Sequence, residues 1–279
     1  MKRVLLLIVT LLMILALAAC AEGAPTQGAA PKNPVIQLST TTSVNDSGLL
    51  PYLQPTFESA TGYKLEITSN GSGAAIKLGE TGDADCLLVH SKAAEEEFVE
   101  NGFGVERIPF MYNYFVIVGP ADDPLKLADC ATATAAFQVI AETKTQEFVS
   151  RGDDSGTHNA EKKIWAAADI DPAGQSWYIS AGAGMGACLT QANERLAYIL
   201  TDKATFLSMA KELELVILLE ESAEMMNTYS VIAVDPDKNP GVNIEGANAF
   251  IRWIQSDEAK NLIAAYGQAQ YGEALFYNL

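Results

Sequence analysis

The sequence predicts an α/β protein of two lobes, each a sheet flanked by helices, joined by two hinge crossovers. Three observations point to this fold. The chain of 279 residues is longer than one hydrophobic core usually serves. Apolar runs alternate with glycine- or hydroxyl-rich turns and helical segments, which is typical of strand–loop–helix units. Two uncharged apolar runs, residues 110–119 and 229–234, each end at a proline-containing turn, as strands crossing between lobes would.

The N-terminal segment has the features of a processed leader. Two cations precede an apolar run over residues 4–17, and small residues stand directly before Cys20. We therefore expect a lipoprotein signal peptide over residues 1–19, lipidation of Cys20, and an Ala-, Gly- and Pro-rich tether over residues 20–34. A transmembrane anchor is the alternative, but the apolar run is shorter than the ~20 residues that a span needs.

Composition argues against several classes of partner. The net charge of −17 disfavours nucleic acid and anionic membrane surfaces. A zinc or copper site lacks ligands, because the chain has two histidines and no Cys-x-x-Cys spacing. Cys86 lies in an apolar run and is expected to be buried, while a bridge between Cys130 and Cys188 stays open. We expect no metal site and no cofactor.

The first lobe is expected to comprise residues 35–116 and 231–279. Its expected strands cover residues 35–38 and 63–68, with a turn followed by a third, buried strand within residues 82–90. Its expected helices cover residues 48–61 and 93–101. Five hydroxyl residues, Ser39 to Ser43, follow the first strand, where they would face the crevice at which open α/β sheets bind ligands. The alternative is a polar run that caps its own helix. Residues 95–97, three glutamates, are expected to form a solvated helix face.

The second lobe is expected to comprise residues 117–230. Its expected strands cover residues 148–150, 197–200 and 216–219, and its expected helices cover residues 131–142, 188–194 and 206–213. A small-residue run at residues 181–187 precedes one of these helices, where its backbone N–H groups would be free. The apolar positions of residues 242–266 are consistent with closing helices on the first lobe.

The polar turn between the strand at residues 148–150 and the next helix is a candidate anion cradle. Ser155, Gly156 and Thr157 supply small side chains and backbone donors where a helix over residues 160–165 would begin. A helix start carries partial positive charge and unpaired N–H groups, so it suits an oxyanion. Arg151 adds several donors and a charge that it cannot lose.

The chain resembles the tungstate-binding lipoproteins and periplasmic proteins of Tup-type ABC importers. The motifs that carry the resemblance are TTTSVNDSGLL, GDADCLLVH, MYNYFVIVGP, FVSRGDDSGTH, GMGACL, YSVIAV and the terminal LFY, which together span most of the mature chain. The resemblance implies a periplasmic-binding-protein type II fold that closes on tetrahedral tungstate and delivers it to an ABC permease and ATPase. It also implies a monomeric, lipid-anchored, extracytoplasmic protein that is not an enzyme.

The resemblance also implies a set of oxyanion-binding residues. These are Thr41, Thr42, Ser43 and Ser72 from the first lobe, and Arg151, Ser155, Gly156 and Thr157 from the second. Ser72 stands where the family usually has threonine, which keeps the hydroxyl. Asp153 and Asp154 are expected to be turn residues that orient Arg151 rather than ligand contacts.

Two other functions compete with tungstate binding. The first is a binding protein for another oxyanion, namely molybdate, phosphate or sulfate. Phosphate is disfavoured because its protonated form needs an acceptor, although Asp153 or Asp154 could supply one. The second is a serine hydrolase, because Asp154-Ser155-Gly156 resembles the nucleophile segment of serine proteases and His158 lies three residues after Ser155. A catalytic triad needs a base within reach of the nucleophile, and a histidine at that spacing inside a helix start points elsewhere.

Overall fold

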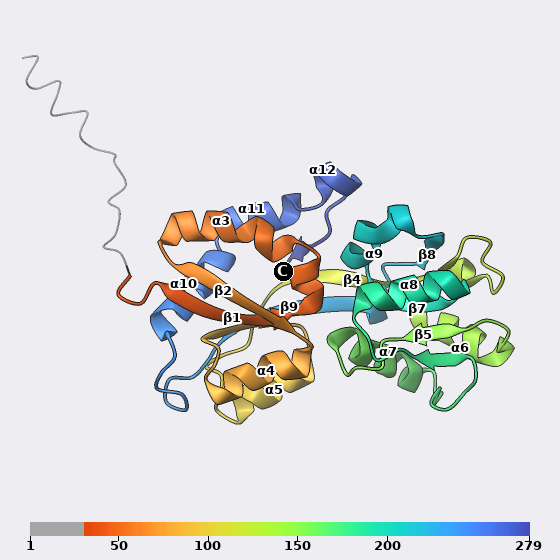
Figure 1. Ribbon diagram of the computed structural model, residues 1–279, viewed down its shortest axis with the longest axis horizontal. Coiled ribbons are helices and arrows are strands. Elements are labelled where there is room, and N and C mark those ends of the chain that lie inside the picture. The colour runs from red at the N-terminus through yellow and green to blue at the C-terminus, as the bar shows by residue number, and fades with distance from the viewer. Residues whose placement is uncertain (1–30) are drawn as a thin grey trace, which may run out of the picture. The chain divides into compact units, whose positions relative to one another are not determined.

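A single sheet connects the whole described part of the chain. The structure, a computed structural model, describes residues 31–279, of which residues 33–279 form one compact unit. The sheet has ten strands in the order β2-β1-β3-β9-β4-β7-β5-β6, with β10 and β8 both paired to β4. The predicted leader, Cys20 and most of the predicted tether lie outside the described residues. The fold is the expected α/β arrangement with helices on both faces of a central sheet (Figure 1).

The strands and helices have the following bounds. The strands are β1 Val35–Thr41, β2 Lys64–Asn70, β3 Cys86–Val89, β4 Ile108–Pro120, β5 Phe148–Ser150, β6 Tyr178–Ser180, β7 Tyr198–Asp202, β8 Leu215–Leu219, β9 Met226–Ala233 and β10 Tyr277–Asn278. The α-helices are α2 Thr42–Asp46, α3 Leu49–Thr61, α4 Ser72–Thr81, α5 Lys92–Glu100, α6 Ala133–Thr143, α7 Gly156–Ala167, α8 Met185–Arg195, α9 Lys203–Met209, α10 Ile244–Ile254, α11 Asp257–Ala265 and α12 Gln268–Tyr271.

The first lobe is built on the parallel strands β2, β1 and β3, followed by antiparallel β9. Helices α3, α10 and α11 bury their apolar side chains on one face of these strands, and α4 and α5 bury theirs on the other. All four residues of β3 are buried, because both faces of the sheet are covered at that point. The uninterrupted apolar run over residues 86–89 is therefore explained.

The second lobe is built on the parallel strands β7, β5 and β6, with β8 on the other side of β4. Helices α6 and α7 cover one face through an aromatic cluster that includes Phe137, Phe148 and Trp165. Helices α8 and α9 cover the other face through residues such as Leu189 and Phe206. Each lobe thus has its own core on each side of the sheet.

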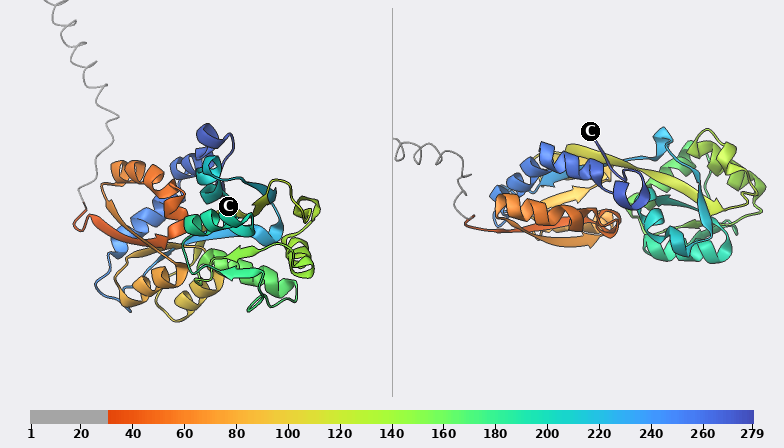
Figure 2. Two further views of the ribbon diagram at one scale, coloured as in Figure 1. Left: turned by 45° about the vertical axis from the view of Figure 1, so that its right-hand side comes forward. Right: turned by 90° about the horizontal axis from the view of Figure 1, so that it is seen from above.

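Strand β4 runs from one lobe into the other, as the uncharged aromatic run predicted. Residues 108–114 pair with β9, whereas residues 115–120 pair with β7 and β8 (Figure 2). Strand β9 returns the chain to the first lobe and begins at Met226, earlier than the expected residue 229. The assignment of residues 35–116 with 231–279, and of 117–230, to the two lobes stays a prediction.

The first helix after β1 differs from the expectation. A short helix, α2, precedes α3, so that Thr42 and Ser43 are helical residues. Gly48 separates the two helices in a left-handed conformation with φ of 84°, which costs glycine little. A Cβ at this position would lie 2.5 Å from the hydroxyl of Tyr266, so the close approach of that ring also requires glycine.

Three expectations about single segments were wrong or are now settled. The predicted solvated face on residues 95–97 was wrong for Glu95, which is completely buried and accepts a hydrogen bond from Arg107 at 2.7 Å. Helix α7 begins at Gly156 rather than near residue 160, because Ser155 caps it. Cys86 is buried as expected, and Cys130 and Cys188 are free thiols rather than a bridge. No helix within residues 31–279 is long and apolar enough to cross a membrane.

Candidate functional site

The hydroxyl run at the end of β1 divides into two functions. Ser39 donates to the carbonyl of Ala75 on α4, and Thr40 donates to the carbonyl of Leu88 on β3. These two side chains therefore join β1 to α4 and β3 and do not face a crevice. The hydroxyls of Thr41 and Ser43 lie 3.2 Å apart and are buried. Thr42, between them, is half-buried.

Ser72 is the first residue of α4, the helix that follows β2. The N-cap residue of this helix is Gly71, which has no side chain that could accept a hydrogen bond from the N–H groups of the first turn. The Ser72 side chain is buried, and its Oγ has no hydrogen-bond partner within residues 31–279. This predicted ligand residue is therefore a hydroxyl shielded from water with an unused donor.

We call the predicted binding residues of the two lobes the first wall (Thr41, Thr42, Ser43 and Ser72) and the second wall (Arg151, Ser155, Gly156 and Thr157). The second wall lies on the turn after β5 and the start of α7. Gly152 takes a left-handed φ of 62°, and a Cβ there would lie 2.0 Å from Ser180 Oγ, so only glycine fits. Ser155 then caps α7 by accepting a hydrogen bond from the backbone N–H of His158 at 3.3 Å. Gly156 and Thr157 occupy the first turn of this helix and are both buried.

Arg151 is held by its neighbour in the turn. Its Nη2 donates to Asp153 Oδ2 at 2.5 Å, and Asp153 Oδ1 accepts from the backbone N–H of Ser155 at 3.2 Å. Partial burial acts to raise the pKa of Asp153, but the hydrogen bonds from Ser155 and the charge of Arg151 keep that pKa below its usual value. Asp153 thus orients Arg151, as expected. Asp154 does not, because it is exposed and pairs with Lys162 at 2.7 Å.

Three buried donors in the two walls lack a partner in the described protein. They are Ser72 Oγ in the first wall and Arg151 Nε and Thr157 Oγ1 in the second. A buried donor left unpaired costs roughly 1–3 kcal/mol, and more when it is charged. Unpaired buried donors also occur outside the predicted set, at residues such as Asn113, Trp177 and Ser230, but within residues 31–279 only the one at this turn is a guanidinium. The chemistry that satisfies hydroxyl and guanidinium donors together is that of an anion.

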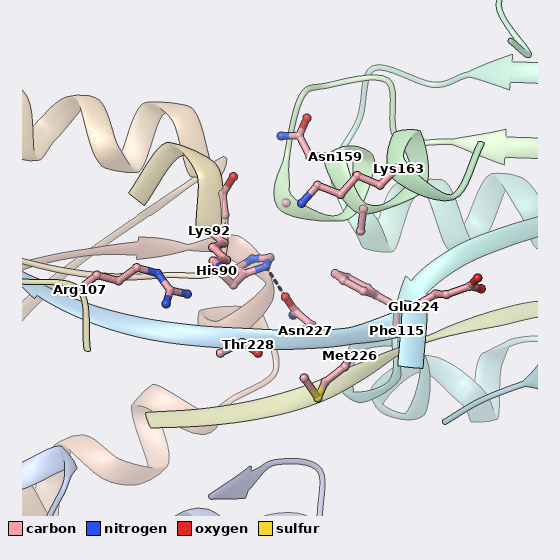
Figure 3. Close-up of a pocket in the computed structure, with 13 residues that line it drawn as sticks. His90, Lys92, Arg107, Phe115, Asn159, Lys163, Glu224, Met226, Asn227 and Thr228 are labelled. Atoms are coloured by element: carbon pink, nitrogen blue, oxygen red, sulfur yellow. Dashed lines mark hydrogen bonds between the residues drawn. The ribbon is translucent and has the colours of Figure 1, made fainter. Parts of the chain in front are cut away.

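His90 was missed by the sequence reasoning and connects the two walls. It directly follows β3, and its Nε2 lies 3.2 Å from Ser43 Oγ. Its Nδ1 lies 2.8 Å from Asn227 Oδ1 (Figure 3). A Cβ on Gly156 would lie 2.2 Å from His90 Cε1, so the imidazole contacts the start of α7. Contacts therefore run from Thr41 through Ser43 and His90 to Gly156.

The imidazole of His90 is neutral in this environment. Burial lowers the pKa of His90 to about 4, and the positive charge of Arg151 lowers it further, against the opposing effect of the hydrogen bond with Asn227. The signal that could have found this residue is its place directly after a buried strand, since ligand-facing residues of α/β sheets gather at strand ends.

Asp202 is a second residue that the sequence reasoning missed. It ends β7 and caps α9, accepting from the backbone N–H of Thr205 at 2.8 Å. Burial raises the pKa of its carboxyl, while the hydrogen bonds from Thr205 and the charge of Arg151 oppose that rise.

A cavity of about 400 Å³ opens beside His90, Asn227 and Gly156. Its lining comes from both lobes: His90, Ser91, Lys92, Arg107, Phe115, Gly156, Asn159, Ala160, Lys163, Glu224, Met226, Asn227 and Thr228. Gly156 belongs to the predicted binding set, whereas the other predicted residues do not line this cavity. The cavity adjoins the predicted binding set at two places, because Gly156 lines it and His90, which also lines it, contacts Ser43. Lys163 extends into the cavity from α7 (Figure 3).

No group of three or more histidine, cysteine, aspartate or glutamate side chains able to hold a metal ion occurs among the described residues. The donors at the site are hydroxyl, backbone N–H and guanidinium groups, which bind oxygen atoms of an anion and not a cation.

Comparison with known proteins places these features in a family. The model of the PBP superfamily domain matches residues 23–258. The chain is 48% identical to the tungstate-binding protein TupA of Peptoclostridium acidaminophilum, covering 99% of this chain and 98% of that one. It is 40% identical to TupA of Campylobacter jejuni, covering 80% of this chain and 84% of that one.

A solved structure agrees with this relationship. The structure of the tungstate-binding protein TupA from Desulfovibrio alaskensis superimposes with a TM-score of 0.79 at 40% identity, covering 88% of this chain and 99% of that one. Proteins that share only a fold can have much lower sequence identity, whereas here the identity is 40–48% and extends over most of the chain. The chain belongs to the PBP superfamily and, within it, to the family of the TupA tungstate-binding proteins.

Proposed function

We propose that this protein captures tungstate between its two lobes and delivers it to an ABC importer. The observation that carries the proposal is the set of buried donors without a protein partner, Ser72 Oγ, Arg151 Nε and Thr157 Oγ1, which come from both walls. The N-terminal end of α7, with Gly156 at its first position, adds backbone donors and a favourable dipole. The similarity to TupA proteins along the whole chain supports tungstate as the anion.

Tight binding requires more than the three unpaired side-chain donors. A hydrogen bond to a charged group contributes roughly 1.5–3 kcal/mol, and a nanomolar dissociation constant corresponds to about 12 kcal/mol. Three such bonds supply about 4.5–9 kcal/mol, so the backbone N–H groups at the start of α7 must contribute as well. Only an anion that touches both walls stabilises the closed arrangement, by as much as its affinity differs between the closed and open states.

Other oxyanions fit the site less well. Phosphate that carries a proton needs an acceptor in the site, but Asp153 is engaged with Arg151 and Ser155, and Asp154 is exposed and paired with Lys162. Sulfate is smaller and would not reach donors on both walls at once. Molybdate is nearly the size of tungstate and stays the principal alternative.

The geometry disfavours a hydrolase. His158 donates to Ser155 through its backbone N–H, while its imidazole Nδ1 accepts from the backbone N–H of Asp154 at 2.9 Å. The imidazole therefore does not act on the Ser155 hydroxyl as a general base would. We infer that the protein is a binding protein and not an enzyme.

The cellular location of the protein follows from its proposed role. An importer's binding protein works outside the cytoplasm, and the expected lipid on Cys20 would keep this one, as a monomer, at the membrane beside its permease and ATPase. Cys20 and the signal peptide lie outside the described residues, so this part rests on the sequence.

Isothermal titration calorimetry with four sodium salts tests the proposal. Tungstate should bind most tightly, molybdate comparably or more weakly, and sulfate and phosphate far more weakly or not at all. A preference for phosphate or sulfate, or an absence of tungstate binding by a folded protein, would overturn it.

A further inference from the structure

His90 is a buried titratable group that oxyanion binding, as described so far, does not use. Only about 9% of its surface is exposed, and its ring centroid lies 4.9 Å from that of Tyr229. It contacts two predicted ligand residues, Ser43 through Nε2 and Gly156 near Cε1. An imidazole in this place controls which hydrogens the neighbouring side chains can offer to an anion.

The hydrogen bonds around Asn227 determine which nitrogen of His90 carries its hydrogen. Asn227 Nδ2 donates to Asn113 Oδ1 at 2.9 Å and to the hydroxyl oxygen of Tyr229 at 2.8 Å. Both amide hydrogens are then used, so Asn227 presents its oxygen to His90. His90 Nδ1 is therefore the donor in the 2.8 Å contact with Asn227 Oδ1.

The neutral imidazole of His90 therefore accepts a hydrogen bond from the hydroxyl of Ser43. With its hydrogen on Nδ1, a neutral histidine has only a lone pair on Nε2. Ser43 Oγ, at 3.2 Å, must then donate to His90, and its single hydrogen is unavailable to a ligand. Thr41 can donate only once as well, and its hydroxyl lies 3.2 Å from Ser43 Oγ. In this state Thr41 donates to Ser43 and Ser43 donates to His90, so neither hydrogen is free for a ligand.

The arrival of a dianion changes the charge that His90 experiences. Arg151, on the turn after β5, is the charged group that acts on the free imidazole, and it disfavours protonation. Other charged groups line the same cavity as His90: Lys92 on α5, Arg107 before β4, Lys163 on α7 and the carboxylate of Glu224 before β9. Glu95 neutralises Arg107, and Tyr229 on β9 packs against the ring. A bound dianion would outweigh the charge of Arg151 and favour a second positive charge nearby.

We propose that His90 is a positioning residue of the oxyanion site that takes up one proton from solvent when the anion binds. Protonated His90 keeps its bond to Asn227 and gains an Nε2–H that donates to Ser43 Oγ. Ser43 then turns its own hydrogen toward the anion, so that proton uptake converts Ser43 from a donor to His90 into a donor to the ligand. This inference rests on the proposed binding of a dianion.

Titration calorimetry with sodium tungstate in two buffers of different ionisation enthalpy measures the proton uptake directly. At pH 6.5 the wild-type protein should take up a substantial fraction of a proton per anion, and less at pH 8. His90→Gln should abolish this uptake and weaken binding at pH 6.5 about tenfold. His158→Gln tests the other histidine of the chain: uptake that disappears in this variant but persists in His90→Gln would overturn the role of His90.

The possible results separate the inference from the proposed function. If tungstate gives no binding heat, the proposed function fails. Tungstate binding without proton uptake, or uptake that persists in His90→Gln, overturns the role of His90 alone. If His90→Gln does not fold, NMR of the wild-type protein with labelled histidine answers the same question. The His90 ring signals should move to imidazolium values on addition of tungstate, and unchanged neutral signals would overturn the inference.

Discussion

Arg151 and Asp153, two residues apart in one turn, are joined by a hydrogen bond of 2.5 Å between Nη2 and Oδ2, while Arg151 Nε stays buried without a partner. Asp153 therefore holds one end of the guanidinium and leaves the other for a ligand. One nitrogen of the guanidinium, Nη2, thus fixes the orientation of the side chain, and another, Nε, is left to bind the ligand. This relationship also explains how the carboxylate of Asp153 can stand beside an anion site, while Asp154 is exposed and pairs with Lys162.

Replacement of Arg151 is expected to have the largest effect on tungstate affinity. Arg151→Ala should weaken binding by about 2–5 kcal/mol, because a buried charged donor is lost. Arg151→Lys should recover only part of this, since an ammonium lacks the fixed pair of donors that holds Asp153 and a ligand together. Calorimetry measures both variants, and unchanged affinity in Arg151→Ala would refute the role given to this residue.

Gly156→Ala is expected to disturb the contact between α7 and His90. The added Cβ would lie 2.2 Å from His90 Cε1, so either the imidazole or the helix start must move. Overpacking of this kind costs about 1–3 kcal/mol, which should appear as weaker tungstate binding. Gly241→Ala is the matched control, because a Cβ there meets nothing within 4 Å. Equal affinities for the two variants would show that the contact does not matter for binding.

Two adjacent lysines allow a test of the cavity as the route to the site. Lys163 lines it, whereas Lys162 pairs with Asp154 outside it. Lys163→Gln should lower the association rate constant for tungstate about two- to fivefold at low salt, because local positive charge attracts the anion. Lys162→Gln changes the net charge equally and should have a smaller effect. Stopped-flow measurements at several salt concentrations decide this, and identical rates for both variants would count against the cavity.

Glu161 should make the stability of the protein depend on pH. Burial raises its pKa to about 7 from the usual 4.5, although hydrogen bonds from Tyr178 and Trp165 oppose the rise. The folded state therefore binds more protons than the unfolded state between these two values, and stability falls as pH rises through that window. Glu161→Gln should remove a fall on the order of a few kcal/mol between pH 4.5 and pH 8.

Urea denaturation at the two pH values measures this contribution. Glu147→Gln, at an exposed ion pair with Arg195, is the surface control and should keep the wild-type pH dependence. A Glu161→Gln protein with the same pH dependence as wild type would show that the buried carboxyl is not responsible.

Cys20→Ser tests the expected lipid anchor. The variant should appear in the soluble fraction of cells rather than in the membrane fraction, because serine cannot carry the thioether-linked lipid. Its affinity for tungstate should be unchanged, since the binding residues lie far along the chain from residue 20. Retention of the variant in the membrane fraction would contradict lipidation at this position.

Local signals determined the elements and the candidate residues. Uncharged apolar runs marked β3, β4 and β9, and small residues with a capping serine marked the start of α7, because these preferences act over a few neighbouring residues. The glutamates of α5 show the limit of such signals. They look alike in sequence, and only the distant Arg107 makes Glu95 a buried partner.

The sequence by itself therefore determined a two-lobed α/β binding protein with Arg151 and a helix start at its centre. The tertiary structure alone decided how these parts act together. Ser43, His90 and Asn227 are separated by 47 and 137 positions along the chain, yet they form one hydrogen-bonded series. No local preference of a histidine after a buried strand predicts such partners. They are set by the order of strands in the sheet, which brings β1, β3 and β9 side by side.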